Sequence, residues 1–102
     1  MDNLDFVFEI ERVINEIAEI IDQNDKEARF DIDLGDGILT LGCEYGTYVI
    51  NKQTATREIW LSSPISGPYH FAFLNNKWQS RSGVELFQIL TNELGIAINE
   101  LV

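Results

Sequence analysis

The sequence has little of the side-chain chemistry on which many enzymes and metal centres depend. It contains one cysteine, Cys43, and one histidine, His70. A single cysteine cannot form an internal disulfide or a multi-thiolate metal site, so we expect Cys43 to be a small buried residue in a reducing, cytoplasm-like compartment. No serine or cysteine nucleophile lies in a motif with His70, and we find no phosphate-loop, dinucleotide-binding or zinc spacing. We therefore expect no catalytic site.

Long apolar runs and basic residues are also scarce. No window approaches the ~18 apolar residues that a membrane-spanning helix needs. The acidic start, Met1 to Asp5, differs from basic, acid-poor targeting segments, so neither a secretory nor a mitochondrial one is expected. The net charge is −10, and residues 1–36 alone contribute −9. Such polarised acidity makes nucleic acid and anionic membranes poor partners, and it favours cations and basic proteins.

The apolar residues that are present predict one folded domain over residues 1–102. Residues 5–24 carry apolar side chains three or four positions apart, which predicts a helix with one buried face. Alternating segments joined by turn residues then predict five or six strands, at 30–34, 38–43, 47–52, 58–62, 69–74 and 77–80. Their short connections make neighbouring strands antiparallel. We expect an α+β two-layer sandwich, with both helices on one face of the sheet and solvent on the other.

The C-terminal helix is predicted over residues 82–94. Ser82 and Glu85 have the spacing of a capping box, with Ser82 as the N-cap and Glu85 reaching back. The apolar side of this helix is expected to comprise Val84, Phe87, Leu90 and Leu94. Gly95 is the expected C-cap, and residues 96–102 form an apolar tail that would cover an edge of the core.

The predicted first helix and first strand share an acidic surface that supplies the candidate metal ligands. The candidates are the acids of the helix, at Asp5, Glu9, Glu11, Glu16, Glu19, Asp22 and Asp25, and those of the strand, at Asp31 and Asp33. One interpretation is an ordinary solvated helix face, which Arg12 supports because it is spaced to pair with Glu9 and Glu16. The other is a surface that meets positive charge, since like charges at helix-neighbour spacing cost about 0.2–0.5 kcal/mol per pair. Carboxylates suit hard cations such as Ca, Mg, Mn and oxygen-liganded iron, here at an exposed and weak site.

The segment from Asp31 to Gly37 resembles the first half of an EF-hand calcium loop. Gly35 stands where a ligand belongs, however, and Gly42 stands where the bidentate glutamate belongs. We therefore interpret the segment as a strand followed by a tight hairpin turn at Gly35-Asp36-Gly37.

Trp60 stands where a half-buried strand should point at water. Ile59 and Leu61 alternate with it, so if they face the core, Trp60 faces solvent on the open face of the sheet. In the predicted strand 69–74, Tyr69 and Phe71 flank His70. By the same alternation, His70 should point to the opposite face of the sheet from these two aromatic residues. Trp78, in contrast, is expected in the core or at its edge. An exposed tryptophan in a polar neighbourhood suggests a contact surface. His70 is then either an ordinary surface histidine or a polar contact that shares this surface with Trp60.

Several segments together resemble one known family. They are DGILTL (36–41), GTYVINKQ (46–53), IWLSSPISGP (59–68), FLNNKW (73–78) and GVELFQILTNEL (83–94). With the acidic first helix, they resemble the frataxin family, whose bacterial members are called CyaY. The resemblance spans nearly the whole chain and implies a single frataxin-like domain with an α–β-sheet–α sandwich. The Tyr69-His70 pair after SGP is similar to the bacterial members.

The resemblance also implies a function. Frataxins bind ferrous and ferric iron weakly through acids of the first helix and the edge of the first strand. They act in iron–sulfur cluster assembly by binding the complex of cysteine desulfurase and scaffold protein. By resemblance, the acidic surface binds iron and docks on the basic desulfurase. The implied ridge acids are Glu19, Asp22, Asp25, Asp31 and Asp33, and Glu16, on the same helix flank as Glu19, is added to them as a candidate metal ligand. The implied partner contacts on the open sheet face are Asn51, Lys52, Gln53, Trp60 and His70.

Three functions are consistent with these observations. The leading one is a non-enzymatic iron-binding protein that regulates cluster assembly or supplies iron to it. We expect it in the bacterial cytoplasm, as a monomer that could oligomerise with iron. The alternative is a ferroxidase that oxidises and stores iron, although the sequence lacks the Glu-x-x-His pattern of a di-iron site. A third is an acidic adaptor that binds protein and no metal.

Overall fold

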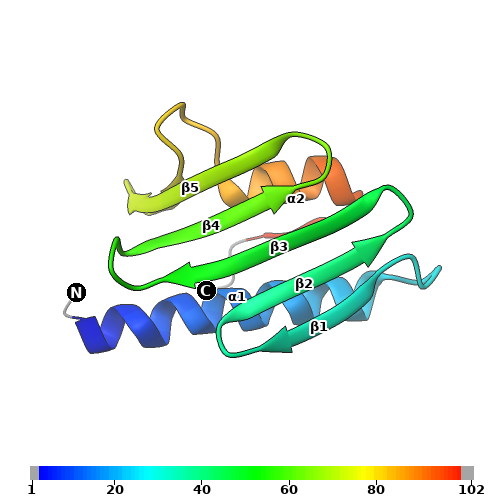
Figure 1. The fold of residues 1–102 in the computed structure, drawn as a ribbon, viewed down its shortest axis with the longest axis horizontal. Coiled ribbons are helices and arrows are strands. Elements are labelled where there is room, and N and C mark those ends of the chain that lie inside the picture. The colour runs from blue at the N-terminus through cyan, green and yellow to red at the C-terminus, as the bar shows by residue number, and fades with distance from the viewer. Residues whose placement is uncertain (1–2, 100–102) are drawn as a thin grey trace.

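The structure, a computed structural model, describes residues 3–99 and forms one antiparallel sheet with two helices. The elements are α1 (Asn3–Asn24), β1 (Asp31–Gly35), β2 (Ile38–Cys43), β3 (Gly46–Gln53), β4 (Glu58–Ser63), β5 (Gly67–Leu74), β6 (Lys77–Gln79) and α2 (Leu86–Leu94). Each strand pairs antiparallel with the next along the chain, so the sheet order is β1-β2-β3-β4-β5-β6 (Figure 1). The strand count and the antiparallel pairing predicted from the sequence are confirmed.

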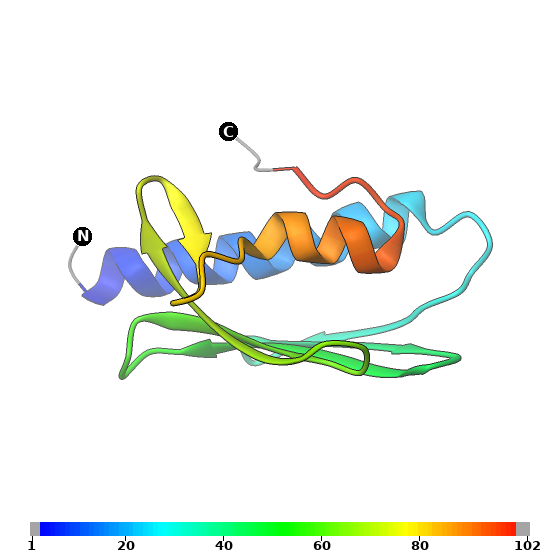
Figure 2. The ribbon, with the colours of Figure 1, turned by 90° about the horizontal axis from the view of Figure 1, so that it is seen from above.

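Both helices lie on the same face of the sheet (Figure 2). No helix within residues 3–99 covers the opposite face, which we call the open face. The predicted two-layer α+β sandwich is therefore confirmed. Since side chains alternate along each strand, each strand divides into one set of residues that meets the helices and one that lies on the open face.

The core lies between the helices and the sheet. From α1 it buries Phe6, Ile10, Val13, Ile14, Ile17, Ala18 and Ile21, and from the sheet Leu39, Leu41, Tyr48, Ile50, Ile59, Leu61, Phe71 and Trp78. Burial of a large apolar side chain stabilises a fold by about 1.5–3 kcal/mol. The three- and four-residue spacing on α1 thus predicted the packed face, with Ile20 only partly buried at its margin. Trp78 is 2% exposed, which confirms its expected place in the core.

The β1–β2 hairpin confirms the rejection of an EF-hand. Asp36 and Gly37 have φ of 52° and 74°, the left-handed geometry of a tight two-residue hairpin turn. Gly37 also lies close to β3: a Cβ added at Gly37 would come 2.9 Å from Cε of Lys52. The Lys52 amide donates to the Gly37 carbonyl at 3.0 Å.

The predicted start of the second helix was wrong. The N-cap is Glu85, whose carboxylate accepts the amide protons of Phe87 and Gln88, and not Ser82. Gly83 has φ of 87°, a left-handed conformation that interrupts the backbone between Ser82 and the helix. The buried residues of α2 are accordingly Leu86, Leu90 and Leu94, whereas Val84 and Phe87 are only partly buried. The predicted C-cap at Gly95 is confirmed, with φ of 72°.

The tail after α2 packs on the core as expected, as far as the structure describes it. Ile96 and Ile98 are 5% and 2% exposed. The Thr91 hydroxyl holds the tail by accepting from the amide of Ile98 and donating to its carbonyl. The rest of the predicted tail, residues 100–102, lies outside the described residues. Cys43 is only partly buried, because its strand ends there, and its thiol donates to the Gly46 carbonyl at 3.3 Å.

A carboxylate of α2 ties the helix to the sheet at the far end of the core. Glu93 accepts hydrogen bonds from the hydroxyls of Tyr48 (3.0 Å), Ser63 (2.6 Å) and Ser66. Ser63 in turn accepts the amide protons of Ile65 and Ser66. Burial and hydrogen bonding raise the pKa of Tyr48, so its phenol stays protonated and able to donate. This network fixes the β4–β5 turn relative to α2, and sequence reasoning missed it because its members are far apart in the chain.

Glu93→Ala is expected to destabilise the domain by roughly 1–3 kcal/mol, because it leaves partly buried hydroxyls without an acceptor. The measurement is the free energy of unfolding by urea. Asn92→Ala is the matched control, since Asn92 is exposed on the same helix and should change stability by less than about 0.5 kcal/mol. Equal stabilities for the two variants would contradict a structural role for the Glu93 network.

Candidate functional site

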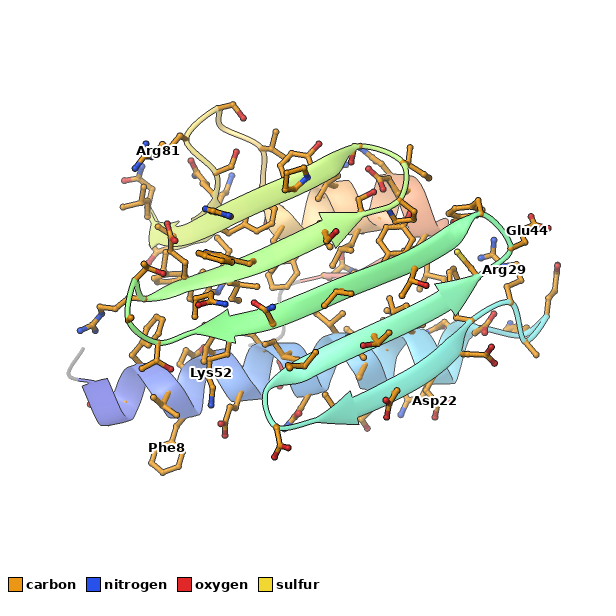
Figure 3. All side chains as sticks on the ribbon, viewed as in Figure 1. Phe8, Asp22, Arg29, Glu44, Lys52 and Arg81 are labelled. Atoms are coloured by element: carbon orange, nitrogen blue, oxygen red, sulfur yellow. The ribbon has the colours of Figure 1, made fainter. Side chains whose placement is uncertain are left out.

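The six predicted metal-binding acids lie on α1, on the connection that follows it and on the edge strand β1, and we call this region the acidic surface. Glu16, Glu19 and Asp22 belong to α1, Asp25 follows it, and Asp31 and Asp33 project from β1. β1 is the edge strand of the sheet, and both of its aspartates are exposed on the open face. Figure 3 shows Asp22 on α1 next to this outer strand.

Three of these acids already have partners. Glu16 forms a salt bridge with Arg12 at 2.7 Å, and Glu19 accepts from the Gln23 amide at 3.2 Å. Asp25 accepts the backbone amides of Arg29 and Phe30, both at 2.9 Å and one on each carboxylate oxygen. Asp25 therefore shapes the connection between α1 and β1, and it is less available as a metal ligand than its spacing suggests.

The other three acids, Asp22, Asp31 and Asp33, are exposed, and their carboxylates make no hydrogen bond or salt bridge within residues 3–99. Among the described residues, no three Asp, Glu, His or Cys side chains come close enough together to hold a metal ion. The structure thus places the predicted acids on α1, its following connection and β1, but it does not assemble them into a coordination sphere. Exposed carboxylates of this kind suit a hard cation held loosely, and salt would screen the attraction over about 8 Å at physiological ionic strength.

A second set of predicted residues forms a row across the open face. Asn51, Trp60 and His70 lie directly opposite one another on β3, β4 and β5. The flanking residues Ile59 and Leu61 are 0% and 2% exposed, so the predicted direction of Trp60 is confirmed. Trp60 itself is half-buried rather than fully exposed, because neighbours on its own face cover part of the ring.

Two neighbours contact the Trp60 indole. The imidazole of His70 stacks on it, with ring centroids 4.0 Å apart and planes within 6°. The indole Nε1–H donates to Oε1 of Glu58 at 2.9 Å. Alternation along the strand had placed Glu58 on the same face as Trp60, but sequence reasoning included only His70 among the contact residues.

Lys52 does not lie on the open face, and its grouping with the open-face residues was wrong. It alternates with Asn51 and Gln53, so it points toward the helices, where its Nζ forms a 2.6 Å salt bridge with Glu11 of α1. Figure 3 shows Lys52 directed toward that helix. Gln53 stays on the open face and donates to Asn51 Oδ1 at 3.2 Å.

Known proteins are similar to this chain in both sequence and fold. A sequence profile described as a frataxin-like domain matches residues 1–100. The chain belongs to the frataxin family. The resemblance noted in the motifs around Asn51 and Trp60 is thereby confirmed.

Relatives of this frataxin domain include bacterial and yeast proteins. The chain is 49% identical over 72 residues to a mitochondrial frataxin homolog of Saccharomyces cerevisiae, covering 69% of this chain and 41% of that protein. It therefore spans about two fifths of the length of that relative. A solved frataxin from Psychromonas ingrahamii, placed in the CyaY family, superposes with a TM-score of 0.83 at 25% identity and covers 98% of this chain and 100% of the other.

Yeast frataxin has also been solved as a trimer complexed with ferrous. It superposes on this frataxin domain with a TM-score of 0.69 at 36% identity, over 98% of this chain and 88% of the other. Among the residues that the structure describes, no helix is long and apolar enough to cross a membrane.

A groove of about 810 Å³ borders Trp60 on the open face of the frataxin domain. Its lining includes Thr56, Glu58, Trp60, His70 and Arg81, the last from the loop between β6 and α2. Figure 3 shows Arg81 near the end of β5. The groove thus combines an aromatic pair with one carboxylate and one guanidinium.

Glu58 is expected to make the stability of the domain sensitive to acid. Its hydrogen bond from Trp60 is the main cause that lowers its pKa below the usual 4.5, and the charges of His70 and Arg81 contribute. A carboxylate with a lowered folded-state pKa stabilises the fold above its unfolded pKa, and that contribution is lost as the pH falls through the folded value. We therefore expect wild-type stability to fall below about pH 4.5 more steeply than that of Glu58→Gln. Urea unfolding of both proteins between pH 3 and 6 measures this difference. If their unfolding free energies changed with pH in parallel, the prediction would be contradicted.

Proposed function

We propose that the protein binds iron weakly at its acidic surface and regulates iron–sulfur cluster assembly, or supplies iron to it, by binding the complex of cysteine desulfurase and scaffold protein. Membership of the frataxin family is the observation that carries this proposal. A yeast frataxin has been solved in complex with ferrous, which supports iron as the cation. Iron is here a substrate or cargo of the protein.

The iron part of the proposal rests on the exposed acids. Asp22, Asp31 and Asp33 present carboxylate oxygens that no other described residue engages. Oxygen donors of this kind suit ferrous and ferric iron among the hard cations. The separation of the acids argues for loose binding with several water ligands rather than for a closed site.

The partner part rests on charge and on the open face. The net charge of −10 favours a basic partner surface, and electrostatic attraction would speed its approach. Asn51, Gln53, Trp60 and His70 are the proposed contacts on the open face, where a half-buried tryptophan suits an interface anchor. Lys52 would take part only at the margin, since it is directed toward α1. We propose a monomer in a cytoplasm-like compartment that could oligomerise with iron, as a trimeric yeast relative suggests.

A cysteine desulfurase assay with the scaffold protein tests the proposal. Adding this protein should change the rate of sulfide production, and the change should depend on the iron concentration. A change that persists in the presence of chelator would favour the protein-only adaptor, and no change would overturn the proposal. Anaerobic iron loading followed by oxygen-uptake measurement separates the ferroxidase alternative, because only a ferroxidase would consume oxygen catalytically.

A further inference from the structure

The Trp60 ring is held by two contacts of different kinds. Glu58, two residues earlier on β4, accepts the indole N–H at 2.9 Å. A hydrogen bond to a charged acceptor is stronger than one between neutral groups. It also distinguishes the two edges of the ring, because only the edge that carries Nε1 can donate.

His70 supplies the second contact from the neighbouring strand. It lies directly opposite Trp60 on β5, and the ring planes are within 6° at a centroid distance of 4.0 Å. Stacking fixes the plane of the indole, whereas the bond to Glu58 fixes which edge faces along β4. Because a tryptophan side chain has only two torsions, the two contacts together define its orientation.

We infer that Glu58 is a positioning residue that, together with His70, holds Trp60 in the orientation in which a partner protein meets it. The inference rests on the proposed function, in which Trp60 contacts the assembly complex. Two consequences follow for recognition. The indole N–H is already bonded, so the partner packs against the free parts of the ring and does not accept a hydrogen bond from it. The ring is also ordered before binding, which lowers the entropy that association must overcome.

The orientation of Trp60 can be tested in the free protein. The chain has two tryptophans, so a ¹⁵N-labelled sample gives separate indole N–H signals for Trp60 and for the core residue Trp78. Glu58→Ala should increase hydrogen exchange of the Trp60 indole with water by about tenfold or more, since the bonded proton becomes free. Trp78 should be unchanged, and Glu58→Gln should retain slow exchange because its amide carbonyl can accept the same proton. Unchanged exchange at Trp60 in Glu58→Ala would overturn the inference.

The consequence for recognition needs the partner complex. Glu58→Ala should weaken binding of the full chain to the desulfurase–scaffold complex by about five- to tenfold, and Glu58→Gln should stay within about twofold of wild type. Glu44→Ala is the charge-matched control, because Glu44 is exposed at the opposite end of the sheet (Figure 3). Melting temperatures identify any variant that is merely unfolded.

The possible failures are distinguishable. If wild-type protein does not bind the complex, the proposed function fails and the partner role of Glu58 fails with it, while indole exchange still decides whether Glu58 orients Trp60. If Glu58→Ala releases the indole proton but binds as tightly as wild type, the positioning role is overturned and the proposed function stands.

Discussion

Trp60→Ala is expected to weaken binding to the desulfurase–scaffold complex by at least about 30-fold while leaving the domain folded. Tryptophan anchors at protein interfaces commonly contribute more than about 2 kcal/mol to binding, which corresponds to that factor. The alanine variant removes the ring that lies between Asn51 and His70 on the open face. It does not alter the acidic surface, so iron binding should be unchanged.

The cost of Trp60→Ala to folding should be modest but measurable. Trp60 is half-buried and stacked on His70, and aromatic pairs add about 0.5–1.5 kcal/mol beyond their buried area. We therefore expect a loss of about 1–2 kcal/mol of unfolding free energy, which is more than a freely exposed ring would contribute. Trp78→Ala is the matched control, because that ring is 2% exposed and its loss should cost about 3–5 kcal/mol.

Each variant is measured by urea unfolding, iron titration and affinity for the assembly complex. The expected pattern for Trp60→Ala is a small change in stability with a large loss of affinity. A loss of stability as large as that of Trp78→Ala, with affinity intact, would mean that Trp60 serves the fold and not a partner. Loss of iron binding in Trp60→Ala would contradict the separation of Trp60, on β4, from the acids of α1 and of the edge strand β1.

Side-chain alternation and helical spacing were sufficient to predict most of this architecture. The three- and four-residue spacing of α1 identified its buried face, and Ile59 and Leu61 fixed the direction of Trp60. These signals are local, because the period of a helix or strand alone decides which of its side chains face the core and which face solvent. The predicted start of α2 failed for an equally local reason, since Gly83 adopts a left-handed conformation that a pattern of polar residues does not reveal.

The errors in the candidate site came from non-local contacts or from grouping residues by motif. Lys52 was grouped with Asn51 and Gln53 as one segment, although alternation alone would have placed it on the other face. In the sequence, Asp25 is one more acid among the candidate metal ligands. In the fold, its carboxylate accepts hydrogen bonds from two backbone amides of the connection between α1 and β1. Glu93 carried no sequence signal at all, because Tyr48 and Ser63 reach it from distant strands.

The distinction between exposed and partly buried acids leads to a prediction for the acidic surface. Replacing Glu19, Asp22, Asp31 and Asp33 by their amides should weaken iron binding by at least about tenfold, because the charge and number of oxygen ligands set the affinity of such sites. The same variant should unfold at a higher temperature. Like charges at helix-neighbour spacing, such as Glu19 and Asp22, cost about 0.2–0.5 kcal/mol per pair, and the substitutions remove that repulsion.

Asp25→Asn is the informative comparison, because it also removes one negative charge but weakens bonds to the amides of Arg29 and Phe30. It should lower the unfolding free energy by about 1 kcal/mol, the usual net contribution of one hydrogen bond, because the amide offers one acceptor oxygen in place of two. It should reduce iron affinity less than the fourfold variant does. Calorimetric melting and anaerobic iron titration at low and high salt measure both effects. Unchanged iron affinity in the fourfold variant would exclude the acidic surface as the iron site. A stabilising Asp25→Asn would show that repulsion outweighs its backbone hydrogen bonds, since the two effects act on stability with opposite sign.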